Sequence, residues 1–334
     1  MSTRWGMTVP LGGVSLADHA AVFRGLADAG FTDVWSSEVA GSDAFTPLTL
    51  AAVWEPRLQL GTAIAPVFTR GPALLAMTAA ALADTAPGRF QLGIGASSPV
   101  VVGDWNAVEF TEPFKRSRDV LRFLRAALAG EVVNEEFETF AVRRFRLERP
   151  PATPPQILLA ALRPGMLRLA ADQADGVILN WLSAGDVPTA LAETKAAGPD
   201  FDVVARIFVC PTEDAAYARM LGRRLITSYL TVPAYADFHR WLGRDQVFAP
   251  MWAAWSAGDR KGALAAIPDE VVDELIVHGS PAECRAKVQA YADAGVKVPV
   301  MALLPTPELE QGGAAALAAL VRALGRGPGD QEPR

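Results

Sequence analysis

Two stretches of small residues at the ends of predicted strands are the features of this sequence that point most directly to chemistry. One predicted strand, Arg89 to Ile94, leads into Gly95-Ala96-Ser97-Ser98-Pro99. An earlier predicted strand, Leu58 to Ile64, carries Gly61-Thr62-Ala63-Ile64 and runs into Ala65-Pro66. A strand end without bulky side chains lets a flat molecule approach the backbone closely. The two stretches therefore predict a wide, shallow cradle for a planar heterocycle.

The glycines of these stretches have two alternative roles that compete with a cradle. Gly95 can simply serve a turn, and Gly93-Ile94-Gly95 can be a fragment of a dinucleotide-binding fingerprint. The fingerprint requires a third glycine at a fixed spacing and a helix that begins directly afterwards. Neither feature follows Gly95, so the fingerprint is excluded, whereas the turn stays open.

A predicted helix start after a strand is the second chemical signal. Pro164-Gly165-Met166 follows the predicted strand Gln156 to Ala160 closely. The free backbone N–H groups and the positive dipole end of such a helix favour an anion, for example a phosphate. Arg163 just before it can bind a phosphate through two hydrogen bonds, or it can be a solvated surface arginine.

Glu38 is the carboxylate that the strand pattern places beside the cradle, at the end of the predicted strand Asp33 to Ser36. A carboxylate there can contact the polar edge of a bound ring or exchange a proton. The alternative is a loop carboxylate that pairs with an arginine. Glu38 is thus the candidate catalytic residue, and we expect it to position a ring slightly more than to move a proton.

Histidines and cysteines form no arrangement typical of catalysis. His19, His239 and His278 have no partner at a useful spacing, so neither a catalytic triad nor a metal site is predicted. Cys210 and Cys284 are too isolated to indicate a zinc site or a disulfide framework.

Composition excludes several classes of partner. The chain has 334 residues, a net charge of −6 and a mean hydropathy of +0.19. No basic surface for nucleic acid is predicted, and no run of about 18 apolar residues predicts a membrane span. The first residues lack the pattern of a signal peptide. We therefore expect a cytoplasmic enzyme that acts on a small molecule, with a homo-oligomer as an open alternative to a monomer.

Strands and helices alternate along the chain, and the strands are continuously apolar, as in Ile157-Leu158-Leu159. Such strands are typical of a parallel sheet buried on both faces. Eight predicted strands favour a (β/α)8 TIM barrel over a doubly wound sheet, with its chemistry at the carboxyl ends of the strands. The eight are residues 5–9, 33–36, 58–64, 89–94, 156–160, 176–180, 202–210 and 298–304.

Two insertions interrupt the alternation. Residues 131–144 alternate apolar and polar side chains, which predicts a β-hairpin. The segment of about residues 212–273 is rich in Trp and Tyr and too long for one crossover, which predicts a helical cap. We expect one barrel domain over 1–325 and a frayed tail over 326–334.

Five stretches in this order resemble the luciferase-like monooxygenase superfamily, and most of all its oxidoreductases that use the deazaflavin coenzyme F420. The resemblance covers about residues 4–310 and is weakest after Thr212. It is carried by residues 30–38, 60–72, 84–98, 160–166 and 174–180.

The resemblance implies a non-proline cis peptide at Ala63–Ile64 that supports the central ring, and a cofactor phosphate at the helix after residue 163. The cofactor-binding residues it implies are Glu38, Ala63, Ile64, Ala65, Gly95, Ala96, Ser97, Ala161, Leu162, Arg163, Pro164, Gly165 and Met166. Leu162 and Arg163 stand where many relatives have small residues. Val39 and Ser98 stand where a similar sugar-phosphate dehydrogenase has a histidine and a glutamate, so that substrate is not implied.

We therefore expect an F420-dependent oxidoreductase that transfers a hydride between F420 and a small organic substrate. The substrate is expected to lie against Ser98, Trp105, Asn180 and Trp181, walled by Tyr229, Tyr235, Phe238 and Trp241 of the cap, although these aromatic residues can equally form the cap's own core. The alternatives are an FMN-dependent monooxygenase on the same barrel and a barrel that binds a cofactor or ligand without turnover.

Overall fold

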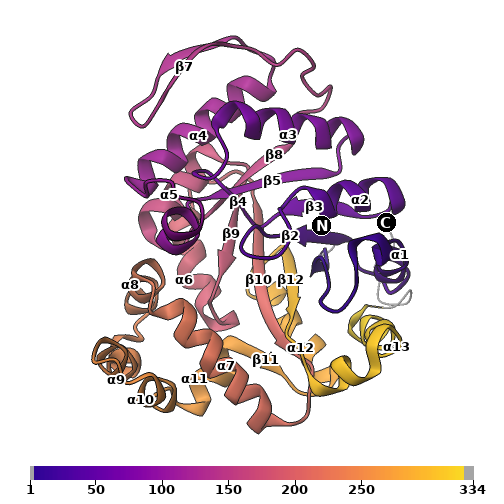
Figure 1. The fold of residues 1–334 in the computed structure, drawn as a ribbon, viewed down its shortest axis with the longest axis vertical. Helices are drawn as coiled ribbons and strands as arrows, with labels where there is room; N and C mark the ends of the chain where they lie inside the picture. The colour runs from indigo at the N-terminus through magenta and orange to yellow at the C-terminus, as the bar shows by residue number, and fades with distance from the viewer. Residues whose placement is uncertain (1–3, 327–334) are drawn as a thin grey trace.

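Eight parallel strands form a closed barrel with helices around it (Figure 1). The structure, a computed structural model, describes residues 4–326. Each strand of the ring pairs with the next, and β12 pairs with β1, which closes the ring. The predicted (β/α)8 barrel is confirmed. In ring order the strands are β1 (Gly6–Thr8), β2 (Asp33–Ser36), β3 (Gln59–Thr62), β5 (Phe90–Gly95), β8 (Gln156–Ala160), β9 (Gly176–Asn180), β10 (Asp202–Cys210) and β12 (Val298–Leu303).

The outer helices follow the sequence signals closely where a proline begins the helix. The predicted bounds of Thr46–Trp54 and Pro113–Leu128 agree with the structure, whereas the helix predicted over 187–196 ends at Leu191 and continues as a 3₁₀ turn. Two elements go beyond the sequence predictions, namely α13 (Pro307–Leu324) and the short β4 (Ala65–Pro66). The outer helices are α1 (His19–Asp28), α2 (Thr46–Trp54), α3 (Pro72–Thr85), α4 (Pro113–Leu128), α5 (Pro164–Gln173), α6 (Val187–Leu191), α12 (Pro281–Asp293) and α13 (Pro307–Leu324). A π-helical segment, Val100–Trp105, follows β5.

The two predicted insertions correspond to a hairpin and a group of helices. β6 (Val133–Glu136) and β7 (Ala141–Phe145) pair in antiparallel fashion and extend away from the barrel (Figure 1). After β10 the chain forms α7 (Ala215–Leu230), α8 (Pro233–Trp241), α9 (Asp245–Ser256), α10 (Arg260–Ala265) and α11 (Asp269–Leu275). The chain then returns through β11 (Ile276–His278), a strand missed in the sequence, which pairs with the carboxyl end of β10. Of the predicted tail, 327–334 lie outside the described residues, while the Arg326 guanidinium lies over the Trp5 ring at 4.6 Å.

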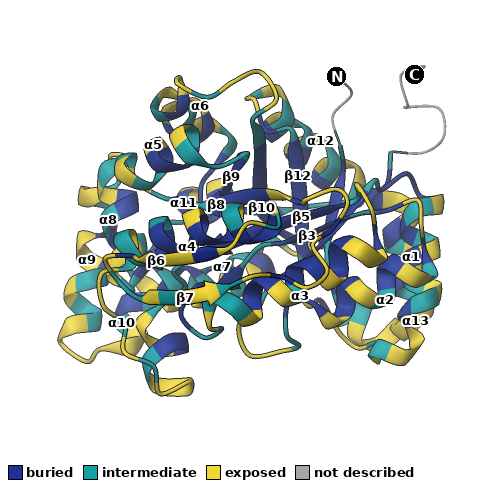
Figure 2. Cartoon of the chain, turned by 90° about the horizontal axis from the view of Figure 1, so that it is seen from above, coloured by how far each residue is buried: buried dark blue, intermediate teal, exposed yellow. Residues whose placement is uncertain are grey.

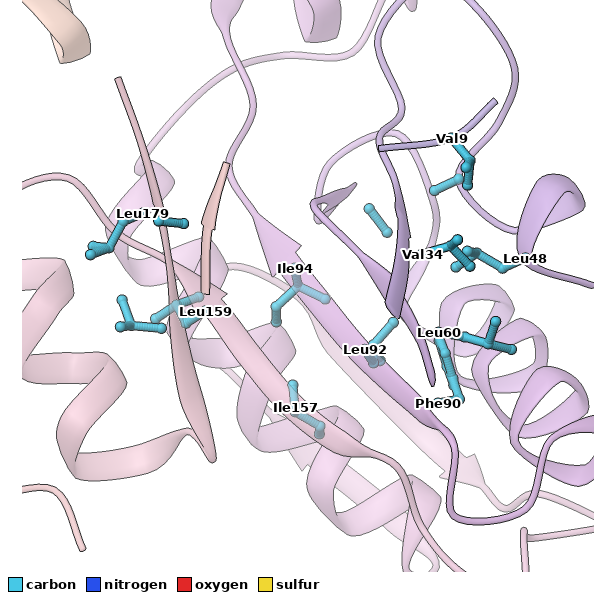
Figure 3. Packing of buried hydrophobic residues seen from close by; sticks show 14 of the residues in the cluster. Val9, Val34, Leu48, Leu60, Phe90, Leu92, Ile94, Ile157, Leu159 and Leu179 are labelled. Atoms are coloured by element: carbon cyan, nitrogen blue, oxygen red, sulfur yellow. The ribbon is translucent and has the colours of Figure 1, made fainter. Parts of the chain in front are cut away.

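Apolar side chains on the outer face of the strands pack against the helices. Figure 3 shows Leu48 of α2 beside Val34 of β2 and Leu60 of β3, and the same layer continues through Ile94 and Leu159. The barrel strands are mostly buried, whereas the hairpin strands β6 and β7 are largely exposed and the outer helices expose one face to solvent (Figure 2). This layer is the largest apolar cluster among the described residues.

The interior of the barrel has a separate core. Trp35 fills it together with a ring of aliphatic side chains, namely Leu158, Ile178, Val204, Val298 and Val300. Gly61 lies beside Trp35 in the neighbouring strand, and a Cβ atom there would stand 2.3 Å from the indole ring. The glycine in β3 is therefore required by the packing of Trp35.

Charged residues close the amino-terminal end of the barrel. Arg4 forms an ion pair with the buried Asp33 of β2 and a second one with Asp202 of β10, at 3.1 Å. Its guanidinium also donates to Gln91 of β5 at 2.7 Å. One side chain thus links three strands that are distant in the sequence.

We predict that Arg4→Met lowers the free energy of unfolding by about 3 kcal/mol, because it leaves the buried carboxylate of Asp33 without its partner. Denaturant unfolding measures the loss. The matched control is Arg149→Met, whose ion pair with Asp84 is exposed and is expected to contribute less than about 1 kcal/mol. Equal losses in the two variants would contradict a special role for Arg4.

The buried side chain of His239 in the cap makes the stability of the protein depend on pH. The side chain is fully buried beside Phe238 and Phe248. Burial, and then the charge of Arg244, lower its pKa to about 4, so the folded protein holds a neutral imidazole. The unfolded chain binds a proton below about pH 6.5, and the folded chain does so only near pH 4.

We therefore predict that the free energy of unfolding falls as the pH drops from about 6.5 to about 4, by up to about 3 kcal/mol from this group. His239→Leu should remove this part of the pH dependence while other groups keep theirs. Unfolding curves at several pH values in both proteins measure it. If the free energy of unfolding depends on pH equally in the variant and the wild type, His239 is not the source of the dependence.

Candidate active site

A cavity of about 700 Å³ lies at the carboxyl ends of the barrel strands, between the barrel and α8. Its lining is mostly apolar. It brings together twelve of the predicted cofactor and substrate contacts, which come from four separate segments of the chain. These are Ala63, Ile64, Gly95, Ala96, Ser97, Ala161, Leu162, Arg163, Pro164, Gly165, Met166 and Asn180.

The small-residue stretches form one wall of this cavity. The Ala63–Ile64 peptide bond is cis, and the carbonyl oxygen of Ile64 accepts a hydrogen bond from the backbone N–H of Glu38 at 3.2 Å. Gly95 lies inside β5, where a Cβ atom would stand 2.9 Å from the Cβ of Ala160. Close packing of two strands, and not a turn, is what requires this glycine.

The helix start predicted as an anion site also faces the cavity. α5 begins at Pro164, and no side chain caps its first turn. Arg163, Gly165 and Met166 line the cavity beside it. The Arg163 guanidinium pairs at 2.9 Å with Asp237 of α8, so an ion pair joins the barrel rim to the cap.

Glu38 lies two residues after the end of β2, and its carboxylate is engaged in the surrounding loop. It accepts from Arg70 at 2.8 Å and from the backbone N–H of Ala44 at 3.1 Å. Glu38 and Ala65 are not among the residues that line the cavity, and Ala65 is buried in β4. The carboxylate of Glu38 therefore holds the loop after β2 together with Arg70, while its backbone fixes Ile64.

Three of the four expected substrate contacts lie elsewhere. Ser98 accepts a hydrogen bond from the Val101 backbone at 3.3 Å, and Trp105 is 55% exposed at the end of the π-helical segment. Trp181 is buried against Phe208 and Tyr229, with ring centroids 4.4 and 4.8 Å away. Trp181 thus belongs to the core beneath the cap, because its side chain turns away from the cavity that Asn180 lines.

Two further polar side chains of the cavity could contact a ligand. Arg206 of β10, which the sequence analysis missed, and Tyr235 of α8 both line it. An arginine within the apolar run Val203-Val204-Ala205-Arg206-Ile207-Phe208 is the signal that could have identified Arg206. Burial raises the pKa of Tyr235 to about 12, so its phenol is protonated at neutral pH.

Across residues 4–326, no group of three or more His, Cys, Asp or Glu is placed to hold a metal ion. None of the helices in that range combines the length and apolar character that a membrane span needs.

A closed (β/α)8 barrel with a cavity at the carboxyl ends of its strands has the architecture of a TIM-barrel enzyme. The family model of the luciferase-like monooxygenases matches residues 2–297, and this chain belongs to that family.

Two curated relatives and one solved structure are similar to this chain over most of its length. A protein of Mycobacterium tuberculosis described as a coenzyme F420-dependent oxidoreductase is 28% identical over 332 residues, covering 89% of this chain and 92% of its own length. A 5,10-methylenetetrahydromethanopterin reductase of Archaeoglobus fulgidus is 27% identical over 283 residues, covering 80% of this chain and 84% of its own. An F420-dependent secondary alcohol dehydrogenase, solved with an F420–acetone adduct, has a TM-score of 0.76 at 14% identity and covers 97% of this chain and 99% of that one.

Proposed function

We propose that this protein is an F420-dependent oxidoreductase that transfers a hydride between F420 and a small organic substrate. The observation that carries the proposal is one cavity that joins a flat wall of small residues to the open start of α5. The relatives named above support the choice of cofactor, since two of them carry F420 in their own descriptions.

The residues present fit a deazaflavin with an anionic tail. Ala63, Gly95 and Ala96 offer no bulk to obstruct a planar ring, and a side chain at Gly95 would meet Ala160 and Ile64. The uncapped first turn of α5 presents free backbone N–H groups to a phosphate. When bound, a deazaflavin accepts or provides the hydride.

The residues of the chain bind and orient the cofactor, and they exclude water from it. We assign the ring to the Ala63–Ile64 wall and the phosphate to Gly165, Met166 and Arg163. Apolar side chains such as Phe110 and Ile178 surround the remaining space, which keeps water from a reactive cofactor. Glu38 acts here as a positioning residue, because its backbone N–H holds Ile64 and its carboxylate holds Arg70.

We predict that the purified protein binds F420 more tightly than FMN, which separate fluorescence titrations measure. Preference for FMN would instead favour the monooxygenase alternative. Binding of F420 without turnover of any hydride donor or acceptor would favour a barrel that only carries its ligand.

We predict that Arg163→Ala weakens F420 binding by about 1–2 kcal/mol through loss of a charge-assisted contact. The effect stays moderate because Arg163 must first leave Asp237. Arg168→Ala is the matched control, since Arg168 lies on the same helix and pairs with Glu193 at its exposed surface. An unchanged affinity in Arg163→Ala would leave the phosphate to the α5 backbone alone.

For Glu38→Gln we predict F420 binding weakened about threefold to tenfold and little change in rate at saturating cofactor, since the ion pair with Arg70 is lost but no proton transfer is. Arg70→Gln should have the same effect, and the double variant should be no worse than either single one. A fall in turnover of about 10²–10⁴ with normal binding would instead assign Glu38 a proton-transfer role.

Two broader expectations belong to this proposal. Cys210 and Cys284 are both buried and unpaired, which supports a reducing cytoplasm as the compartment. Assembly into a homo-oligomer stays a prediction, which light scattering of the purified protein would test.

A further inference from the structure

Arg206 occupies an unusual place inside the barrel. In β10 every second side chain faces the interior, and Val204, two residues earlier, belongs to the interior core with Trp35. Arg206 is therefore one layer closer to the open end, and it lines the cavity. The cation of Arg206 therefore lies directly above an interior layer that consists only of aliphatic and aromatic side chains.

The charge of Arg206 has no counter-ion among the described residues. Its side chain takes part in no ion pair in residues 4–326, and its buried Nε has no hydrogen-bond partner there. The guanidinium lies over the Phe208 ring at 4.7 Å, a contact that does not neutralise it. The carboxylate that lines the cavity, Asp237, already pairs with both Arg163 and Arg240.

Arg206 is partly exposed, but its Nε is buried without a partner, and taking part of an unpaired guanidinium out of water costs stability. An anion that paired with it would recover that cost. An arginine fork fits the two oxygens of a carboxylate in a planar, bidentate manner. An incoming carboxylate would supply the missing counter-ion and accept the unused donors of the fork.

Two neighbouring side chains add donors for the same anion. Asn180 lies directly opposite Arg206 in the paired strand β9, and its amide oxygen accepts from the Trp181 backbone at 3.0 Å. Its NH₂ group is thereby left to donate. Tyr235 lines the same cavity, and its phenol, which burial keeps protonated at neutral pH, is a second donor.

We propose that Arg206, with Asn180 and Tyr235, binds a carboxylate of the substrate, so that the protein acts on small organic acids. This inference rests on the proposed oxidoreductase function. The same anion chemistry could also come from the cofactor ring when it carries negative charge, and the experiment below separates the two sources.

The test uses benzoate and its neutral counterpart benzamide as probes, titrated by calorimetry into the protein with and without saturating F420. We expect the wild type to bind benzoate at least tenfold more tightly than benzamide. Arg206→Gln should lose this preference and Arg206→Lys should keep part of it. Arg168→Gln, which removes the same charge from the outer surface, should keep all of it.

Unfolding of the protein without ligand provides a readout independent of the cofactor. Arg206→Gln should melt at the same temperature as the wild type or higher, because it removes an uncompensated charge. Benzoate should raise the melting temperature of the wild type and not that of Arg206→Gln. A large destabilisation in both Arg206→Gln and Arg206→Lys would assign Arg206 to the fold and overturn the proposal.

Two further outcomes would also overturn it. Equal affinities for benzoate and benzamide in the wild type, with F420 bound, would exclude a carboxylate site. A loss of F420 affinity of tenfold or more in Arg206→Gln, with the benzoate preference intact, would assign the anion to the cofactor. If F420 fails to bind the wild type, the proposed function fails, while the benzoate preference of the cofactor-free protein still decides the role of Arg206.

Discussion

The indole of Trp35 packs inside the barrel against the backbone of Gly61, where a Cβ atom would stand 2.3 Å from its ring. A closed ring of parallel strands has an interior that must be filled, because a void there would forfeit packing energy. Trp35 and its aliphatic neighbours fill the lower part, and Arg4 links three strands beneath them. Because these residues close the amino-terminal end of the barrel, the carboxyl-terminal end can hold a cavity.

This arrangement sets the character of the cavity. Its walls are backbone and small side chains wherever strands approach closely, as at Gly95 and Ala160, and these positions are rigid. Its polar groups are few and come from different layers. Arg163 lies at the rim and is held by Asp237 of the cap, whereas Arg206 rises directly from the interior core without a counter-ion among the described residues. Two arginines of one cavity thus have different environments, which suits them to different ligands.

Neighbouring residues of one motif have side chains in different environments in the folded protein. Ser97 lines the cavity while Ser98 turns to the Val101 backbone, and Asn180 lines it while Trp181 packs under the cap. Successive side chains at a strand end point in different directions, so a motif identifies a loop more reliably than it identifies the residues that face the ligand. Glu38 follows β2 as expected, but its carboxylate pairs with Arg70 and does not line the cavity.

The sequence by itself determined the alternation of strands and helices, the closed barrel and the loops that surround its open end, because apolar periodicity and helix-start signals are local. It also pointed to the helix start at Pro164 and to the small residues near Gly95. Only the tertiary structure decided that Arg206 lies in the cavity without a carboxylate partner in the described part of the chain. Pairing of charges depends on contacts between strands and cap helices that are far apart in the chain, and no local pattern records them.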